Sequence, residues 1–212
     1  MNRGQFITFE GGEGAGKSSN IQLARERLEA RGIDTLITRE PGGTEVAEAI
    51  RQVLLSQHQE TMADMTELLL VFAARAQHLE QRIKPALARG TWVLCDRFTD
   101  TTYAYQGAGR NMGADPVATL ETLVQGTLRP DLTLLFDVPV EIGMARAGKR
   151  GSPDRIESEA TAFFQAIRNA FLASARQAPA RWRIIDAARP LEDVQQQVTR
   201  VLDDWLEDLA DG

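Results

Sequence analysis

A glycine-rich segment near the amino end constrains this chain more than any other feature. Residues 11–18 read Gly-Gly-Glu-Gly-Ala-Gly-Lys-Ser, which fits the pattern G-x-x-x-x-G-K-[ST]. The segment follows an apolar run at 5–10 and opens a helical pattern, as this motif requires. Its glycines allow backbone N–H groups to converge on a phosphate, and the helix start adds positive dipole. The pattern predicts a nucleotide phosphate site, against the alternative of a glycine-rich turn with an incidental Lys-Ser pair.

The residues of this segment have separate expected roles. The predicted phosphate-binding set is Gly11, Gly12, Glu13, Gly14, Ala15, Gly16, Lys17 and Ser18. We expect Lys17 to neutralise the β- and γ-phosphates and the Ser18 hydroxyl to bind Mg²⁺.

A second candidate lies where the apolar run 92–96 ends in Asp96, followed directly by Arg97. At the carboxyl edge of a parallel sheet this carboxylate would face the same metal ion and phosphates. The alternative is an aspartate that caps the next turn. The guanidinium of Arg97 could make a bidentate contact with an anionic acceptor.

Short β-rich runs alternate with longer helical patterns along the chain, which predicts an α/β fold with a parallel sheet covered on both faces. We expect strands at 5–10, 35–39, 92–96, 132–137 and 183–186. We expect helices at 17–31, 44–55, 63–89, 116–125, 140–147, 157–177 and 191–209. At 212 residues the chain suits a single domain, with the Gly- and Arg-rich stretch 146–155 as a mobile loop between two helices.

Composition excludes several classes of protein. A formal net charge of −6 disfavours general nucleic-acid binding, which normally needs a basic domain. The single cysteine, Cys95, permits no intramolecular disulfide and predicts a cytoplasmic location. No apolar run approaches the length of a membrane span or signal peptide, so we expect no membrane association. Only three of the 24 basic residues are lysines, and neither Lys84 nor Lys149 lies in the Asn-Lys-x-Asp element typical of guanine-specific switches.

The expected helix 63–89 carries apolar residues at helical spacing, so most of them belong to a core. Phe72 fits that core. Arg75 lies three residues later, however, so an aromatic plane and a planar donor could face a ligand base together. Both interpretations stay open, and His78 is expected to be structural.

Six ordered segments resemble those of bacterial thymidylate kinases over essentially the whole chain. They are Phe9-Glu10-Gly11 with the glycine-rich loop, Thr38-Arg39-Glu40-Pro41-Gly42-Gly43-Thr44, Phe72-Ala73-Ala74-Arg75-Ala76-Gln77-His78, Asp96-Arg97-Phe98, Tyr103-Ala104-Tyr105-Gln106-Gly107 and Asp154-Arg155-Ile156-Glu157. The resemblance implies a P-loop nucleoside-monophosphate-kinase fold with a five-stranded parallel sheet and a lid at about 146–157. It also implies Mg²⁺- and ATP-dependent phosphorylation of dTMP to dTDP, a step in dTTP synthesis, by a homodimer.

By position, the same resemblance implies a set of acceptor contacts. Phe72 would stack on thymine, Arg75 would bind its carbonyl edge, and Thr102 and Gln106 would lie near the base. Tyr105 would press on the deoxyribose where a 2′-hydroxyl would stand. Arg97 would hold the acceptor phosphate, Glu10 would approach the sugar 3′-hydroxyl and the phosphates, and Arg39 would line the same side.

The resemblance also divides the family by the position of a catalytic arginine, in the P-loop or in the lid. No arginine lies between Gly11 and Lys17, so the chain resembles the lid-arginine type. We expect Arg150 to contact the transferring phosphoryl group, with Arg146, Lys149 and Arg155 as competitors, and Arg155 to act in lid closure. Gly148 stands where relatives often have a basic residue, and a solvated basic loop is the alternative for the whole stretch.

These expectations combine into one mechanism, in which the γ-phosphoryl group of ATP passes in line to a phosphate oxygen of dTMP without a covalent enzyme intermediate. Two rival functions remain open at this stage. One is a kinase for another nucleotide or nucleoside. The other is a non-catalytic module that binds ATP as a switch ligand.

Overall fold

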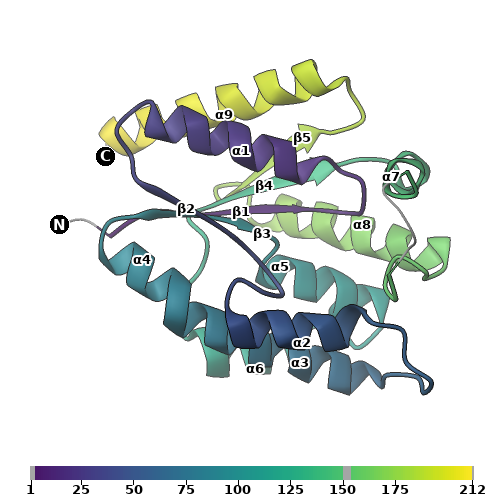
Figure 1. The fold of residues 1–212 in the computed structure, drawn as a ribbon. Coiled ribbons are helices and arrows are strands. Elements are labelled where there is room, and N and C mark those ends of the chain that lie inside the picture. The colour runs from purple at the N-terminus through teal and green to yellow at the C-terminus, as the bar shows by residue number, and fades with distance from the viewer. Residues whose placement is uncertain (1–2, 150–153, 212) are drawn as a thin grey trace.

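The computed structural model describes residues 3–149 and 154–211. Its centre is a five-stranded sheet in which every pair of neighbours is parallel (Figure 1). The strand order is β2-β3-β1-β4-β5. The strands are β1 (Phe6–Gly11), β2 (Thr35–Arg39), β3 (Trp92–Asp96), β4 (Leu132–Asp137) and β5 (Trp182–Asp186). The predicted α/β class and five parallel strands are confirmed.

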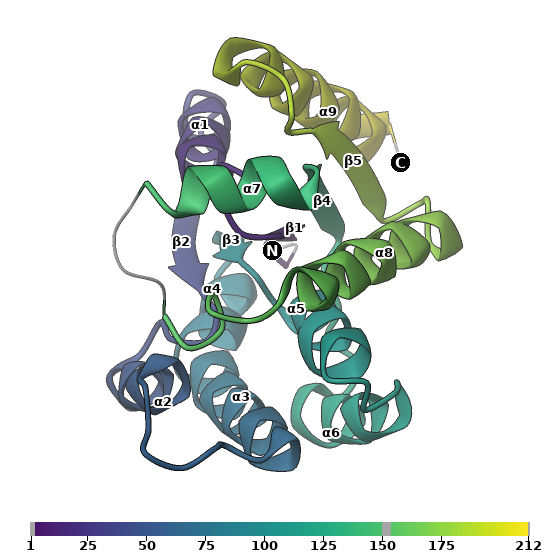
Figure 2. The same ribbon diagram turned by 90° about the vertical axis from the view of Figure 1, so that its right-hand side faces the viewer.

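Helices cover both faces of the sheet. They are α1 (Lys17–Glu29), α2 (Glu45–Leu55), α3 (Asp64–His78), α4 (Lys84–Ala88), α5 (Thr99–Thr102), α6 (Asp115–Gln125), α7 (Val140–Ala147), α8 (Thr161–Gln177) and α9 (Leu191–Asp211). In Figure 1, α1 and α9 lie on one face, and α4, α5, α6 and α8 lie on the other with α2 and α3. Figure 2 looks onto the edge where the strands end and shows α7 crossing in front of the sheet.

Side chains along β1 alternate between the two faces of the sheet, so one strand packs against the helices on both sides. Ile7 and Phe9 point towards α1 and α9, where Phe9 stacks on Phe136 with ring centroids 6.2 Å apart. Phe6 points to the opposite face and meets the edge of Phe98 at 4.9 Å. All six residues of β1 are buried, as expected for a central strand of a covered parallel sheet.

The expected helix 63–89 is interrupted by a wider turn. Between α3 and α4, residues Leu79–Ile83 form a π-helical segment, η1. Pro85 follows it at the start of α4. Proline has no N–H to bond the carbonyl four residues earlier, and its ring clashes with that carbonyl. A π-turn relieves this conflict while the helix continues in the same direction.

Two other boundaries differ from expectation. The segment after β3 forms α5 and a second π-helical segment, η2 (Tyr103–Gly109), where the sequence predicted no helix. Helix α8 begins at Thr161 and not at residue 157. The Asp154 carboxylate accepts from the N–H groups of Ile156 and Glu157 at 2.9 and 2.8 Å, and such bonds favour a turn over a helix interior.

Burial in the sheet predicts a large difference between two apolar side chains. Leu134 in β4 is fully buried, whereas Ile184 in β5 is 50% exposed. Leu134→Ala should lower the free energy of unfolding by about 2 to 5 kcal/mol, because it removes packed atoms and leaves a cavity. Ile184→Ala should cost less than about 1 kcal/mol. Urea unfolding measures both, and equal losses would contradict this account of the core.

Candidate active site

The phosphate loop lies directly against helix α7. Gly14 has a φ of 64°, and a Cβ added there would meet the backbone oxygen of Gly143 at 2.0 Å. A Cβ on Gly143 would in turn meet the backbone oxygen of Glu13 at 2.4 Å. Because both obstacles are backbone atoms, they cannot move aside as a flexible side chain could. Two glycines therefore allow the loop between β1 and α1 to pack on α7.

Lys17, the first residue of α1, folds back over this loop. Its Nζ donates to the carbonyl oxygens of Gly11 and Gly12 at 3.5 and 3.4 Å and lies 3.8 Å from Asp96 Oδ1. The residue is only 8% exposed. Burial lowers the pKa of Lys17, the charge of Arg97 adds to that shift, and Asp96 opposes it. An incoming phosphate would supply the counter-charge that these long contacts do not.

Asp96 ends β3 beside Lys17. Its Oδ1 is buried and has no hydrogen-bond partner in the described part of the chain. Ser18 lines the same cavity. A carboxylate and a hydroxyl suit Mg²⁺, which usually takes few protein ligands and completes its shell with phosphates and water. Among the residues that the structure describes, no group of three or more His, Cys, Asp or Glu side chains could hold a metal ion alone.

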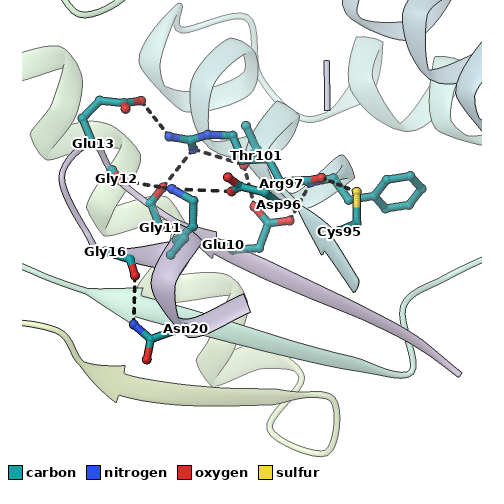
Figure 3. Close-up of polar contacts among 12 residues, drawn as sticks. Glu10, Gly11, Gly12, Glu13, Gly16, Asn20, Cys95, Asp96, Arg97 and Thr101 are labelled. Atoms are coloured by element: carbon teal, nitrogen blue, oxygen red, sulfur yellow. Dashed lines mark hydrogen bonds and ion pairs between the residues drawn. The ribbon is translucent and has the colours of Figure 1, made fainter. Parts of the chain in front are cut away.

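Arg97, directly after β3, reaches the phosphate loop, where Figure 3 shows it beside Gly11 and Glu13. Its Nη1 donates to the Gly11 carbonyl oxygen at 2.9 Å and its Nη2 to Glu13 Oε1 at 2.7 Å. Tyr105 OH donates to the same Glu13 oxygen at 2.8 Å, and the guanidinium carbon of Arg97 lies 4.9 Å from the Tyr105 ring centroid. Arg97 has a φ of 66°, a left-handed conformation that is rare outside glycine and common at functional sites.

A buried polar network orients Arg75 on α3. Its Nε donates to Glu40 Oε2 at 2.7 Å and its Nη2 to Thr102 Oγ1 at 2.9 Å. Glu40 also lies 3.0 Å from His78 Nδ1, and His78 Nε2 lies 2.6 Å from Thr38 Oγ1. The structural role expected for His78 is consistent with this network. Arg75 is 1% exposed, and its Nη1 has no partner among the described residues.

These groups surround one cavity of about 600 Å³ at the carboxyl edge of the sheet. Its walls come from the phosphate loop, the segments after β2 and β3, helices α2 and α3, and the turn at 154–157. The size suits a small-molecule site, and cations together with a buried donor suit an anionic ligand with a polar ring. Open α/β sheets bind ligands at this edge.

Comparison with known proteins gives the family. The family model described as thymidylate kinase matches residues 9–198. A thymidylate kinase of Alcanivorax borkumensis is 63% identical over 201 residues, which cover 95% of this chain and 97% of the relative. Thymidylate kinases of Pseudomonas fluorescens Pf0-1 and Pseudomonas putida W619 are 61% and 59% identical, covering 96% and 95% of this chain and 97% and 98% of the relatives.

The chain belongs to the thymidylate kinase family. The cavity gathers most of the residues that the family resemblance suggested. Its lining includes the predicted loop residues from Glu13 to Ser18 and the predicted side chains Arg75, Asp96, Arg97, Thr102, Tyr105 and Gln106. Gly11 and Gly12 lie behind it, where their carbonyl oxygens accept from Lys17.

Two expected substrate contacts lie elsewhere. Phe72 is buried in a cluster with Leu68 and Val117 and does not line the cavity, whereas its neighbour Val71 does. The Phe72 ring instead lies against the Arg75 guanidinium, 4.7 Å from its carbon. The core interpretation of Phe72 is therefore the one that this geometry supports.

Glu10 also has a different position from the one expected. It is fully buried and does not line the cavity. Its Oε1 accepts from the Phe98 N–H at 2.8 Å and its Oε2 from the Thr101 hydroxyl. Glu10 thus fixes the segment that follows Arg97, and of the two glutamates Glu10 and Glu13 only Glu13 lines the cavity.

Two expected arginines make protein contacts outside the cavity. Arg39 lies 2.8 Å from Glu48 and lines a neighbouring hollow of about 340 Å³, which also touches Ser18 and Asp96. Arg155 donates from Nε to the Leu54 carbonyl oxygen at 2.8 Å and from Nη2 to Glu67 at 2.6 Å. Arg150, the expected lid cation, lies outside the described residues.

Arg51, Val71 and Glu67 are among the cavity-wall residues that sequence reasoning missed. Arg51 on α2 is half-buried there and donates to the Pro41 carbonyl oxygen at 2.9 Å. Val71 and Glu67 both lie on α3. The helical spacing of Glu67, Val71 and Arg75 is a signal that could have identified one shared face.

The position of Glu10 predicts a pH effect on stability. Burial raises the pKa of Glu10 from 4.5 to about 8, the charge of Asp100 adds to the shift, and the hydrogen bond from Thr101 opposes it. The folded protein therefore binds more protons than the unfolded chain between pH 4.5 and 8, so Glu10 lowers stability as pH rises through that window. Each pKa unit corresponds to about 1.4 kcal/mol.

Glu10→Gln removes this titration, so its free energy of unfolding should depend less on pH than that of the wild type. Urea unfolding at pH 5.5, 7 and 8.5 measures the difference. The wild type should lose about 1 to 4 kcal/mol more than the variant over this range. Parallel pH profiles would show that Glu10 does not titrate there.

Proposed function

We propose that this chain transfers the γ-phosphoryl group of ATP to dTMP, giving dTDP. The observation that carries the proposal is one cavity lined by two chemically different sets of groups. The phosphate loop, Lys17 and Arg97 supply a cationic set, and Arg75 offers a buried donor that has no partner among the described residues. The identity of the curated relatives, all thymidylate kinases, supports the choice of acceptor.

The donor nucleotide occupies the phosphate loop in this proposal. Backbone N–H groups at the start of α1 favour the triphosphate, and Lys17 neutralises its β- and γ-phosphates. Asp96 and Ser18 would hold Mg²⁺, which neutralises charge on the phosphates of the bound nucleotide. The unpartnered Asp96 oxygen supports this assignment.

The acceptor lies along the remaining cavity. Arg97 and Arg51 are the cations placed to hold its phosphate, and Arg75 Nη1 would donate to a carbonyl oxygen of the base. Tyr105 and Glu13 are bonded to each other and line the same cavity, and in this proposal the deoxyribose lies beside them. The acceptor phosphate is already ionised at pH 7, so the reaction needs positioning and charge neutralisation more than a general base.

The cation that meets the transferring phosphoryl group belongs to the lid in this proposal. Arg150 keeps the role expected from the family, with Lys149 as its competitor. The fixed contacts of Arg155 with Leu54 and Glu67 favour a role in holding the lid over a role in transfer.

We also propose a cytoplasmic homodimer. Apolar side chains are exposed along α2, α3 and α6, namely Val46, Val53, Met65, Leu69 and Leu123. Adjacent exposed apolar side chains favour contact between copies. No helix in residues 3–149 and 154–211 is long and apolar enough to cross a membrane.

The acceptor assignment gives an order of activities. dTMP should be the best monophosphate, dUMP less than tenfold weaker because it lacks one methyl contact worth about 1 kcal/mol, and UMP poorer still. A 2′-hydroxyl would be pushed against the buried Tyr105. An ADP-release assay over a panel of monophosphates measures this order. Turnover with another acceptor alone, or none, would favour a different kinase or a non-catalytic module.

The lysines give a matched pair of variants. Lys17→Ala should lower kcat by orders of magnitude, because it removes the buried cation of the phosphate loop. Lys84→Ala should change kcat little, since the Lys84 side chain is 42% exposed and pairs with Glu80 in the preceding segment η1. Steady-state kinetics on both decide the point. Similar activity in the two variants would overturn the assignment of the phosphate loop.

A further inference from the structure

Glu67 on α3 is a buried carboxylate that accepts hydrogen bonds from three side chains. It is 2% exposed. Its Oε1 accepts from Gln106 Nε2 at 2.8 Å and from Arg110 Nε at 3.2 Å. Its Oε2 accepts from Arg110 Nη2 at 3.1 Å and from Arg155 Nη2 at 2.6 Å. Both oxygens therefore accept from nitrogen donors. Two of the donors are arginines, which can only donate, and the third is the amide nitrogen of Gln106.

These partners keep Glu67 ionised although it is buried. Burial alone would raise its pKa, but hydrogen bonds from Arg110, Gln106 and Arg155 lower the pKa below the usual value. An ionised carboxylate can only accept hydrogen bonds. The Gln106 amide must therefore turn its nitrogen towards Glu67, and its oxygen is the end that remains for other contacts.

Gln106 on η2 lines the same cavity as Arg75, the residue that would bind the base. Thr102, one helical turn before Gln106, accepts a hydrogen bond from Arg75 Nη2. This bond links Arg75 to the helical segment that carries Gln106. The cavity then presents a donor, Arg75 Nη1, and an acceptor, Gln106 Oε1, from neighbouring walls.

We propose that Glu67 is a positioning residue for base selection, because it fixes the Gln106 amide with its oxygen as the group offered to the acceptor base. This inference rests on the proposed function. A pyrimidine with a carbonyl oxygen and a ring N–H, as in thymine, complements a donor beside an acceptor. Cytosine carries an amino group and an unprotonated ring nitrogen at the same two positions. Its amino donor would face the donor of Arg75, and its ring-nitrogen acceptor would face the acceptor of Gln106.

This pattern makes discrimination against cytosine depend on Glu67, whose two carboxylate oxygens are already bonded to protein side chains. A site built to bond a polar group rejects a mismatched analogue strongly, because buried groups are left unpaired. With Glu67 ionised, rotation of the Gln106 amide by half a turn would place its oxygen against a carboxylate oxygen. The repulsion excludes the orientation that cytosine needs.

The test compares kcat/KM for dTMP and dCMP in the wild type and in Glu67→Gln. The wild type should prefer dTMP by about 100-fold or more. A neutral amide at position 67 can offer either oxygen or nitrogen to Gln106, so Glu67→Gln should reduce that preference by tenfold or more. Glu67→Asp keeps an acceptor-only group and should keep the preference, even where the dTMP KM rises.

Glu121→Gln is the matched control. Glu121 is also buried, accepts from Tyr103 OH at 2.6 Å and pairs with Arg129 at 2.8 Å, but it has no contact with Gln106. Its loss should leave the ratio of dTMP to dCMP activity unchanged. Thermal unfolding of each variant reports the purely structural cost of the lost carboxylate.

A double substitution separates positioning from general disruption. Gln106→Leu should also reduce the preference, and Glu67→Gln added to it should cause no further change in the ratio. A Glu67→Gln variant with lower stability and an unchanged ratio would overturn the proposal, as would a Glu67→Asp variant that loses the preference. If Glu67→Gln does not fold, the Glu67→Asp result decides alone.

The wild-type measurement distinguishes a failure of the proposed function from a failure of the role proposed for Glu67. A wild type without dTMP-dependent ADP release would contradict the proposed function itself. A wild type that is active on dTMP, combined with an unchanged ratio in Glu67→Gln, would contradict only the role of Glu67.

Discussion

The close contact between the phosphate loop and helix α7 is the constraint on which the rest of the site depends. Gly14 and Gly143 bring two backbones within a distance that no Cβ could share. With the loop held there, Lys17 starts α1 beside Asp96, and the carbonyl oxygen of Gly11 faces Arg97. Strand pairing then fixes the other half of the site, because β1 and β3 are direct neighbours. Backbone geometry thus places the charged groups before any ligand is bound.

A second feature of the site is that three arginines in and around the cavity are each held by a carboxylate. Glu13 bonds Arg97, Glu40 bonds Arg75, and Glu67 bonds Arg155. These pairs are mostly buried, so they gain little net stability after desolvation. Their value is orientation, since a guanidinium fixed through some of its donors presents the others in a defined direction. The Nη1 of Arg75, which is buried and has no partner among the described residues, is oriented in this way.

The sequence predicted the sheet and most helices because periodicity reports which residues are buried, and the glycine-rich motif located the phosphate site. It could not decide between neighbouring positions on one element. Phe72 and Val71 lie side by side on α3, and only the packing against Val117 shows that the aromatic ring faces inward. Glu10 and Glu13 differ in the same way, since the end of β1 decides which carboxylate faces the cavity. The π-helical segment η2 has no periodic signal in the sequence, although it carries Tyr105 and Gln106.

Arg155 belongs to a motif that lines the cavity, but its own side chain bonds to the protein. The segment Asp154 to Glu157 does line the cavity at three positions, yet Arg155 itself is absent from the lining. Its backbone N–H and Nε bond the last carbonyl groups of α2, and its Nη2 bonds a carboxylate on α3. A guanidinium used in this way is committed to the protein and cannot also follow a phosphoryl group. Arg155 thus ties the turn at 154–159 to α2 and α3, and through Glu67 it shares a carboxylate with Gln106 in the cavity wall.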